Sequence, residues 1–187
     1  MKSLGLTLLL LIGAASSAVA ATEEFDPCSL LTRREIEEVQ GDRVASQKGS
    51  EPGRERFAVS QCFYTLATFS KSISLEVTRR RPGEAETPRT HWKQMFFRAM
   101  EKGREKEEEA ESGEKADPEK AREAAARPRR ISGVGDEAFW DGSSLGGGLF
   151  VLKGDAYFRL SVGGPDNETV KIEKLKRLAR RALPRLP

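Results

Sequence analysis

Two cysteines and one histidine are the side chains most able to act as nucleophiles, redox groups or metal ligands in this chain of 187 residues. Cys28 and Cys62 lie far apart and form no C-x-x-C motif, and His91 is the single histidine. A structural zinc site needs about four such ligands, and redox cysteines usually form a close pair. We therefore predict a disulfide between Cys28 and Cys62, rather than a redox or metal pair, in an oxidising compartment.

The glycines and acidic residues complete no catalytic or phosphate-binding pattern. The glycines at 146–148 lack the lysine-containing frame of a P-loop, and Gly133 and Gly135 lack the third glycine of a dinucleotide turn. Asp136 and Glu137 are the acidic pair beside apolar residues. His91 is a lone histidine, with no second histidine or free thiol to help it act as a base or metal ligand. We predict no catalytic residue, no cofactor and no metal site.

The first twenty residues have the pattern of a secretory signal peptide. Lys2 supplies a positive start, an apolar stretch follows, and Ala18 and Ala20 provide the small residues of a cleavage site. The apolar stretch is too short to span a bilayer comfortably, although an uncleaved anchor is the alternative. No cysteine follows the apolar stretch directly. We expect cleavage after Ala20 and a soluble periplasmic or secreted product that does not span the membrane.

Composition indicates one domain with little net charge. Residues 21–187 are enough for a single core, and charged residues make up 33% of the chain, with a net charge of +3. Because the signal segment contributes only Lys2, the mature chain is close to neutral. This balance argues against a nucleic-acid partner.

The N-terminal half of the mature chain predicts a helix, two strands and a second helix. Thr32 and Glu35 have the spacing of a capping box, which predicts a helix over 32–40. Residues 42–55 are polar and predict a loop or irregular strand. Strand-forming residues fill 57–67, and alternating apolar residues fill 72–79. A helix then begins near 88–90, with Trp92 and Phe96 on its apolar face.

Residues 101–130 interrupt this pattern with charges of both signs and almost no large apolar side chain, which predicts a charged insertion, helical or flexible. Core character returns with a glycine-containing turn and strand over 133–140. Residues 149–152 and 156–162 form a predicted hairpin, and a last helix covers about 167–183. Sequential antiparallel strands with packed helices indicate an α+β fold made of two halves of similar plan.

Two surfaces are candidates for binding. The first is the sheet and loop around Phe139, Trp140 and Tyr157, where aromatic residues gather. The second is the basic last helix, whose side chains would contact an anionic surface or simply form a solvated face over the core. Its four candidate residues are Lys171, Lys174, Arg177 and Arg181.

Three motifs resemble a family of small bacterial exported proteins of unknown function, many of them lipoproteins. The first is the opening D-P-C-S-L-L-T-x-x-E-I at 26–36. The second is S-x-C-x-Y at 60–64, and the third is G-V-G-D-E-A-F at 133–139. The resemblance implies a pairing of Cys28 with Cys62 and a curved antiparallel sheet packed with helices, similar to a PsbP-like fold. The chain departs from the family in its charged insertion and in lacking a lipid-anchor cysteine.

These observations predict an exported, non-enzymatic protein of the bacterial cell envelope that binds a protein or a small envelope ligand. One alternative is an envelope hydrolase with an unrecognised site, for which a pocket with a partnered His91 would be the signature. The other is a structural or inhibitory protein that acts through the 101–130 arm.

Overall fold

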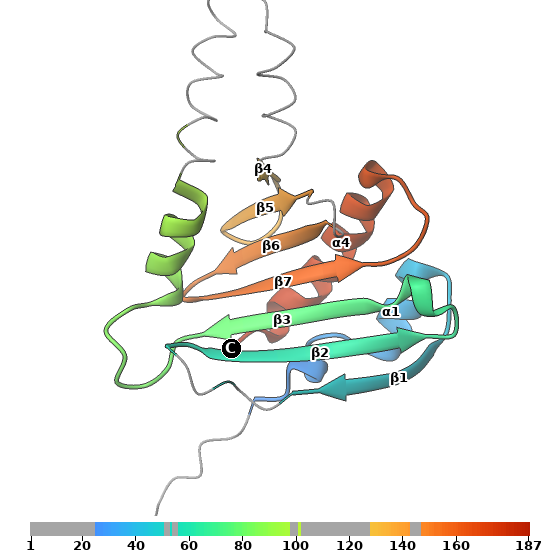
Figure 1. Cartoon of the computed structure of the whole chain (residues 1–187), viewed down its shortest axis with the longest axis horizontal. Coiled ribbons are helices and arrows are strands. Elements are labelled where there is room, and N and C mark those ends of the chain that lie inside the picture. The colour runs from blue at the N-terminus through green and yellow to red at the C-terminus, as the bar shows by residue number, and fades with distance from the viewer. Residues whose placement is uncertain (1–24, 51–52, 54–55, 98–100, 102–127, 143–146) are drawn as a thin grey trace, which may run out of the picture.

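The computed structural model contains an open antiparallel sheet of seven strands in the order β1-β2-β3-β7-β6-β5-β4 (Figure 1). It describes residues 25–50, 53, 56–97, 101, 128–142 and 147–187. The predicted signal peptide and most of the predicted insertion lie outside the described residues. The strands are β1 (Val44–Gly49), β2 (Ala58–Leu66), β3 (Ile73–Arg79), β4 (Arg129–Arg130), β5 (Glu137–Asp141), β6 (Gly148–Lys153) and β7 (Ala156–Val162).

The sheet consists of two meanders joined at its centre. Strands β1 to β3 form one meander and β4 to β7 the other, and all neighbours are antiparallel. The two meet where β3 pairs with β7, with Leu75 opposite Leu160 and Val77 opposite Phe158. The predicted α+β fold with an antiparallel sheet is therefore confirmed, and the two halves of similar plan are these meanders.

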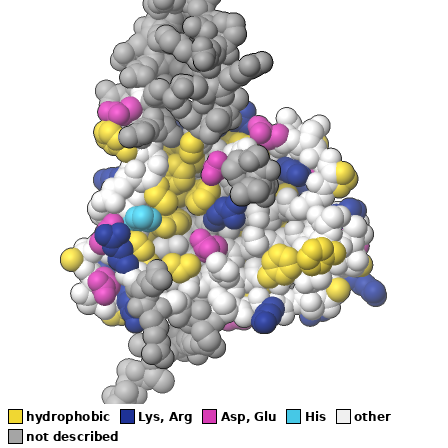
Figure 2. Space-filling model, viewed as in Figure 1, with side chains coloured by type: hydrophobic (Ala, Val, Ile, Leu, Met, Phe, Trp, Pro, Cys, Tyr) yellow, Lys and Arg dark blue, Asp and Glu magenta, His cyan; other side chains and the backbone are white. Residues whose placement is uncertain are grey.

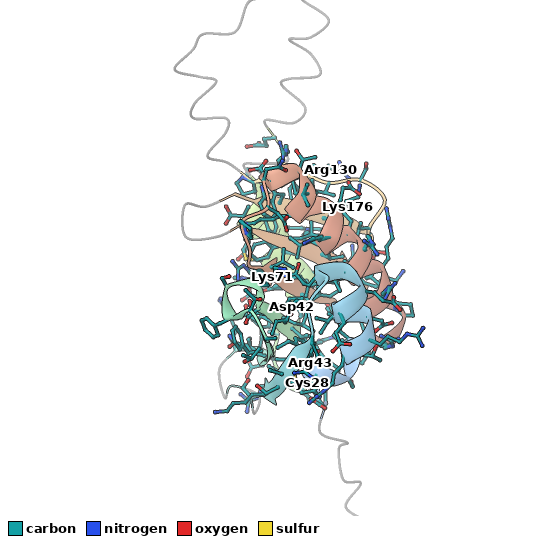
Figure 3. All side chains as sticks on the ribbon, turned by 90° about the vertical axis from the view of Figure 1, so that its right-hand side faces the viewer. Cys28, Asp42, Arg43, Lys71, Arg130 and Lys176 are labelled. Carbon is teal, nitrogen blue, oxygen red and sulfur yellow. A yellow bond between two sulfur atoms is a disulfide. The ribbon has the colours of Figure 1, made fainter. Side chains whose placement is uncertain are left out.

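Helices α1 (Arg33–Gln40) and α4 (Glu168–Ala182) lie side by side on one face of the sheet (Figures 1 and 3). The predicted capping box starts α1, because Thr32 Oγ1 accepts from Glu35 N at 3.3 Å and Glu35 Oε2 accepts from Thr32 N at 2.8 Å. Gly41 ends α1 with a φ of 64°. Among the described residues no helix is long and apolar enough to cross a bilayer.

The main core lies between the sheet and these two helices. Alternate residues of β3 and β7 point into it, so that Ile73, Leu75 and Leu160 are fully buried. Ile172, Leu175 and Leu178 of α4 bury the stripe that the sequence predicted. A short helix, η1 (Pro27–Leu30), closes the β2 side of this core.

Residues 88–97 form a helix that packs on the opposite face of the sheet. Trp92 and Phe96 are buried there, and Phe96 stacks on Phe139 of β5 with ring centroids 4.5 Å apart. The sheet therefore has helices on both faces, but the second face carries the smaller cluster, which involves only β5, β6 and the beginning of β7.

The disulfide Cys28–Cys62 forms as predicted and ties η1 to β2 (Figure 3). Two residues further along β2, the buried hydroxyl of Tyr64 donates to Cys28 O at 3.2 Å. Burial raises the pKa of Tyr64 well above its usual range, and the nearby negative charges of Asp26 and Glu35 add to this effect.

The structure corrects the predicted end of the insertion and shows which secondary structure the segment 42–55 contains. Arg129 and Arg130, predicted as the end of the insertion, form β4 and pair with Trp140 and Phe139. The polar segment over 42–55, predicted as a loop or irregular strand, contains the edge strand β1, whose side chains after Val44 are exposed.

Candidate binding face

Half of the second sheet face carries polar and aromatic side chains that are not packed into a core. They point away from α1 and α4, because they alternate with the core residues of β2, β3 and β7. Within the described part of the chain, the helix over 88–97 buries side chains of β5 to β7 only. Six of the remaining side chains define what we call the open face: Gln61, Phe63, Ser74, Glu76, Arg159 and Ser161.

The strand register brings the polar members of the open face into contact. Glu76 of β3 lies between Gln61 of β2 and Arg159 of β7, and Ser74 lies opposite Ser161. Gln61 Nε2 donates to Glu76 Oε2 at 2.6 Å, and the two serine hydroxyls are 2.6 Å apart. Exposed and half-buried polar groups of β2, β3 and β7 thus form hydrogen bonds with one another.

Glu76 and Arg159 lie directly opposite each other but, within the described residues, form no ion pair together. Glu76 is turned towards Gln61. The Arg159 guanidinium lies over the ring of Phe150, 5.6 Å from its centroid. A Cβ at Gly148 would lie 2.7 Å from Arg159 Nε, so the glycine is what allows the guanidinium to lie there.

An exposed aromatic pair borders the polar cluster. Phe63 of β2 is 41% exposed, and Phe69 of η2 (Phe69–Lys71) is 70% exposed. Their ring centroids are 6.4 Å apart. Figure 2 shows this side of the molecule, where hydrophobic side chains and both signs of charge lie close together.

The aromatic residues predicted as a binding surface are instead buried. Phe139, Trp140 and Tyr157 are 1%, 4% and 7% exposed. Phe139 and Tyr157 pack under the helix over 88–97, whereas Trp140 belongs to the core on the α4 side. Neighbouring strand residues point to opposite faces, so Phe139 and Trp140 cannot share a surface. This prediction is wrong because the three rings are buried in the two cores, one on each face of the sheet.

His91 lies between the rings of Phe57 and Tyr157, at centroid distances of 5.2 and 6.4 Å. Its Nδ1 is 3.8 Å from Glu86 Oε1, which is longer than a hydrogen bond. Glu86 instead binds Arg56, at 2.6 Å. Among the described residues, His91 Nδ1 therefore has no hydrogen-bond partner that orients the imidazole.

The acidic pair at 136–137 has structural partners. Asp136 Oδ2 accepts from Gly154 N at 2.9 Å and also binds Arg89, and the Gly154 hydrogen bond is the main cause of its lowered pKa. Glu137 accepts from Trp92 Nε1 at 3.1 Å. Among the described residues, no group of three or more potential ligands is placed to hold a metal ion.

The basic residues predicted on the last helix are divided by the structure. Lys174 pairs with Asp166 at 2.6 Å, and Arg181 pairs with Glu38 of α1 at 2.8 Å. Lys171 and Arg177 make no ion pair with any described residue. Two of the four basic side chains predicted to contact an anionic surface therefore form ion pairs within the fold.

Comparisons with protein-family models, curated proteins and solved structures find no match to this chain. The family resemblance of the three motifs accordingly stays a prediction. The open face was not among the sequence predictions. Alternation in β3 could have placed Ser74 and Glu76 together, but nothing local indicated Arg159 as their neighbour.

Proposed function

We propose that this protein is an exported, non-enzymatic component of the bacterial cell envelope that binds a partner protein through the open face. The observation that carries the proposal is the opposed but unpaired Glu76 and Arg159. Opposite charges directly across two strands ordinarily stabilise each other. Here each is held by a different neighbour, which leaves the Arg159 N–H groups available for an acceptor on a partner.

The composition of the open face is that of a protein interface. Arginine and aromatic residues are enriched at such interfaces and contribute most of the binding energy. On β2 and η2, Phe63 and Phe69 offer apolar area next to the polar cluster that contains Arg159, and Gln61 with the serine pair offers hydrogen bonds within that cluster. The partner expected here presents a carboxylate to Arg159 and an apolar side chain to the phenylalanine pair.

The shape favours a protein over a small molecule. The six side chains extend over three neighbouring strands, each about 4.8 Å from the next. Small-molecule sites are usually concave and bury most of the ligand, whereas a row of side chains on a sheet suits a second protein surface.

The proposed compartment rests on the signal pattern of residues 1–20 and on the disulfide. A bond between Cys28 and Cys62 is maintained in the periplasm or outside the cell, and is rare in a reducing cytoplasm. The same bond ties η1 to β2, the strand that carries Gln61 and Phe63. Export would thus also stabilise the strand that carries two of the six open-face side chains.

The test is a comparison of what each variant captures from a bacterial envelope extract. The mature, oxidised protein is immobilised as wild type, as Arg159→Gln and as the double variant Phe63→Ser/Phe69→Ser. Matched controls are Arg33→Gln, an exposed arginine on α1, and Phe97→Ser, which removes a 54% exposed ring outside the open face. Captured proteins are identified by mass spectrometry, and their affinities are then measured with purified components.

We expect one partner to bind wild type and both controls, and to lose at least about tenfold in affinity with each open-face variant. Gly148→Ala should weaken binding of the same partner, because the added methyl group displaces the Arg159 guanidinium without removing its charge. Equal capture by wild type and the open-face variants would refute the proposal.

A further inference from the structure

A hollow of about 260 Å³ lies between β4 and α4, at the opposite end of the sheet from β1. Figure 3 labels two of its lining residues, Arg130 and Lys176. The turn after β4 and the first half of α4 form its walls. Ile131 and Ile172 contribute apolar surface to it. The polar side chains that define it are Arg129, Arg130, Ser132, Thr169, Glu173 and Lys176.

The charges around the hollow do not balance. Three cationic side chains line it against one carboxylate, Glu173. Lys176 Nζ binds Glu173 Oε1 at 2.8 Å, and Arg129 binds Glu168 at 2.6 Å. The backbone of Arg130 pairs with β5, but its side chain forms no ion pair or hydrogen bond with any described residue. An uncompensated guanidinium therefore remains at the edge of the hollow.

The other groups in the hollow also favour an anion. Thr169 lies in the first turn of α4, where the helix dipole is positive. The hydroxyls of Ser132 and Thr169 donate to no group in the described part of the chain. Lys176 has a side chain only 20% exposed, and partial burial beside Ile172 strengthens its interaction with a bound charge.

From these observations we infer that the hollow binds a phosphate group, either free or as the headgroup of an anionic lipid. Arg130 supplies two parallel N–H donors to the phosphate oxygens. Lys176 supplies a point charge, and the two hydroxyls add hydrogen bonds. This site is independent of the open face. It also differs from the anionic contact predicted from the sequence, which used Lys171, Lys174, Arg177 and Arg181 of α4.

Two titrations test the inference on the mature, oxidised protein. In the first, inorganic phosphate is added to isotope-labelled protein and followed by NMR. In the second, sedimentation is measured with vesicles of phosphatidylglycerol or of phosphatidylcholine. The variants are Arg130→Gln/Lys176→Gln and the charge-matched control Arg33→Gln/Lys48→Gln, whose two residues are exposed and distant from the hollow.

We expect saturable shifts at 130–132 and 169–176 in wild type, and a loss of about tenfold or more in phosphate affinity for the hollow variant only. Vesicle binding that requires phosphatidylglycerol and is inhibited by phosphate identifies the lipid as the source. Phosphate binding without vesicle binding identifies the free anion. The inference is overturned if neither probe binds, or if the control variant loses as much affinity as the hollow variant.

Discussion

Arg185 binds the carboxylate of Glu35 with both terminal guanidinium nitrogens, Nη1 to Oε2 and Nη2 to Oε1, each at 2.8 Å. Glu35 belongs to α1, and Arg185 belongs to η3 (Leu183–Arg185), which follows α4. The same Glu35 Oε2 closes the capping box at Thr32, and Arg185 Nη1 also donates to Leu30 O at 2.9 Å. This pair therefore connects the beginning of the first helix to the end of the last.

The pair predicts a specific pH dependence of stability. The hydrogen bond from Arg185 lowers the pKa of Glu35 from 4.5 to about 2. Because the pKa is lowered in the folded state, the stabilisation is complete above about pH 4.5 and is lost as the pH falls towards 2. We expect Arg185→Gln to lower the free energy of unfolding by about 1–2 kcal/mol at pH 7, measured by urea denaturation.

The control for this prediction is the pH profile itself. The difference between wild type and Arg185→Gln should shrink as the pH falls from 4.5 towards 2, since protonated Glu35 no longer attracts Arg185. Arg185→Lys should retain part of the effect, because lysine keeps the charge without the two-pronged geometry. A difference that is constant with pH would show that Glu35 is not the responsible partner.

Reducing the disulfide should destabilise the protein strongly. Cys28 and Cys62 are separated by 34 positions, and chain entropy for a loop of that length predicts a loss of about 3–4 kcal/mol. Guanidinium denaturation of the mature protein with and without reductant measures this change. Unfolded, unreduced protein should show no thiol that reacts with an alkylating reagent, and alkylation of both cysteines would contradict the bond.

Gly135 should tolerate no larger residue. Its φ is 62°, and an added Cβ would lie 2.5 Å from Leu152 O, a backbone atom that cannot move aside easily. We expect Gly135→Ala to cost about 2–4 kcal/mol in unfolding free energy. Gly154→Ala is the matched control: its φ is 59° but nothing lies within 4 Å of the added Cβ, so it should cost about 1 kcal/mol.

The N-terminus of the exported protein is predicted to be Ala21. Expression of the full chain in a bacterium with a periplasm, followed by intact mass of the envelope fraction, measures the cleavage position. Replacing Ala18 and Ala20 with bulky residues should block cleavage, because the peptidase needs small side chains there. A mass that retains Met1 in correctly folded, exported protein would contradict the signal peptide.

The local patterns of the chain predicted most elements correctly. The capping box of Thr32 and Glu35 begins α1 as expected, alternation identified β3, and the hairpin of β6 and β7 follows its turn signal. These signals depend on neighbours within a few residues. β1 was less clear because an edge strand with exposed side chains has no apolar alternation to mark it.

Contacts between residues far apart in the sequence could not be predicted from local patterns. Phe139, Trp140 and Tyr157 looked like an aromatic surface, but a sheet with helices on both faces buries rings that point either way. The sequence also contains Arg130 and Lys176 without any sign that they share a hollow. Their proximity arises because β4 lies at the sheet edge beside α4.

The sequence by itself determined the helix and strand types, the α+β class and the partnership of Cys28 with Cys62, because each depends on residue type, spacing or cysteine number. Only the tertiary structure decided the joining of the two meanders at β3 and β7, and with it the meeting of Glu76 and Arg159. The physical reason is that strand register is set by the packing of whole faces, to which each residue adds little.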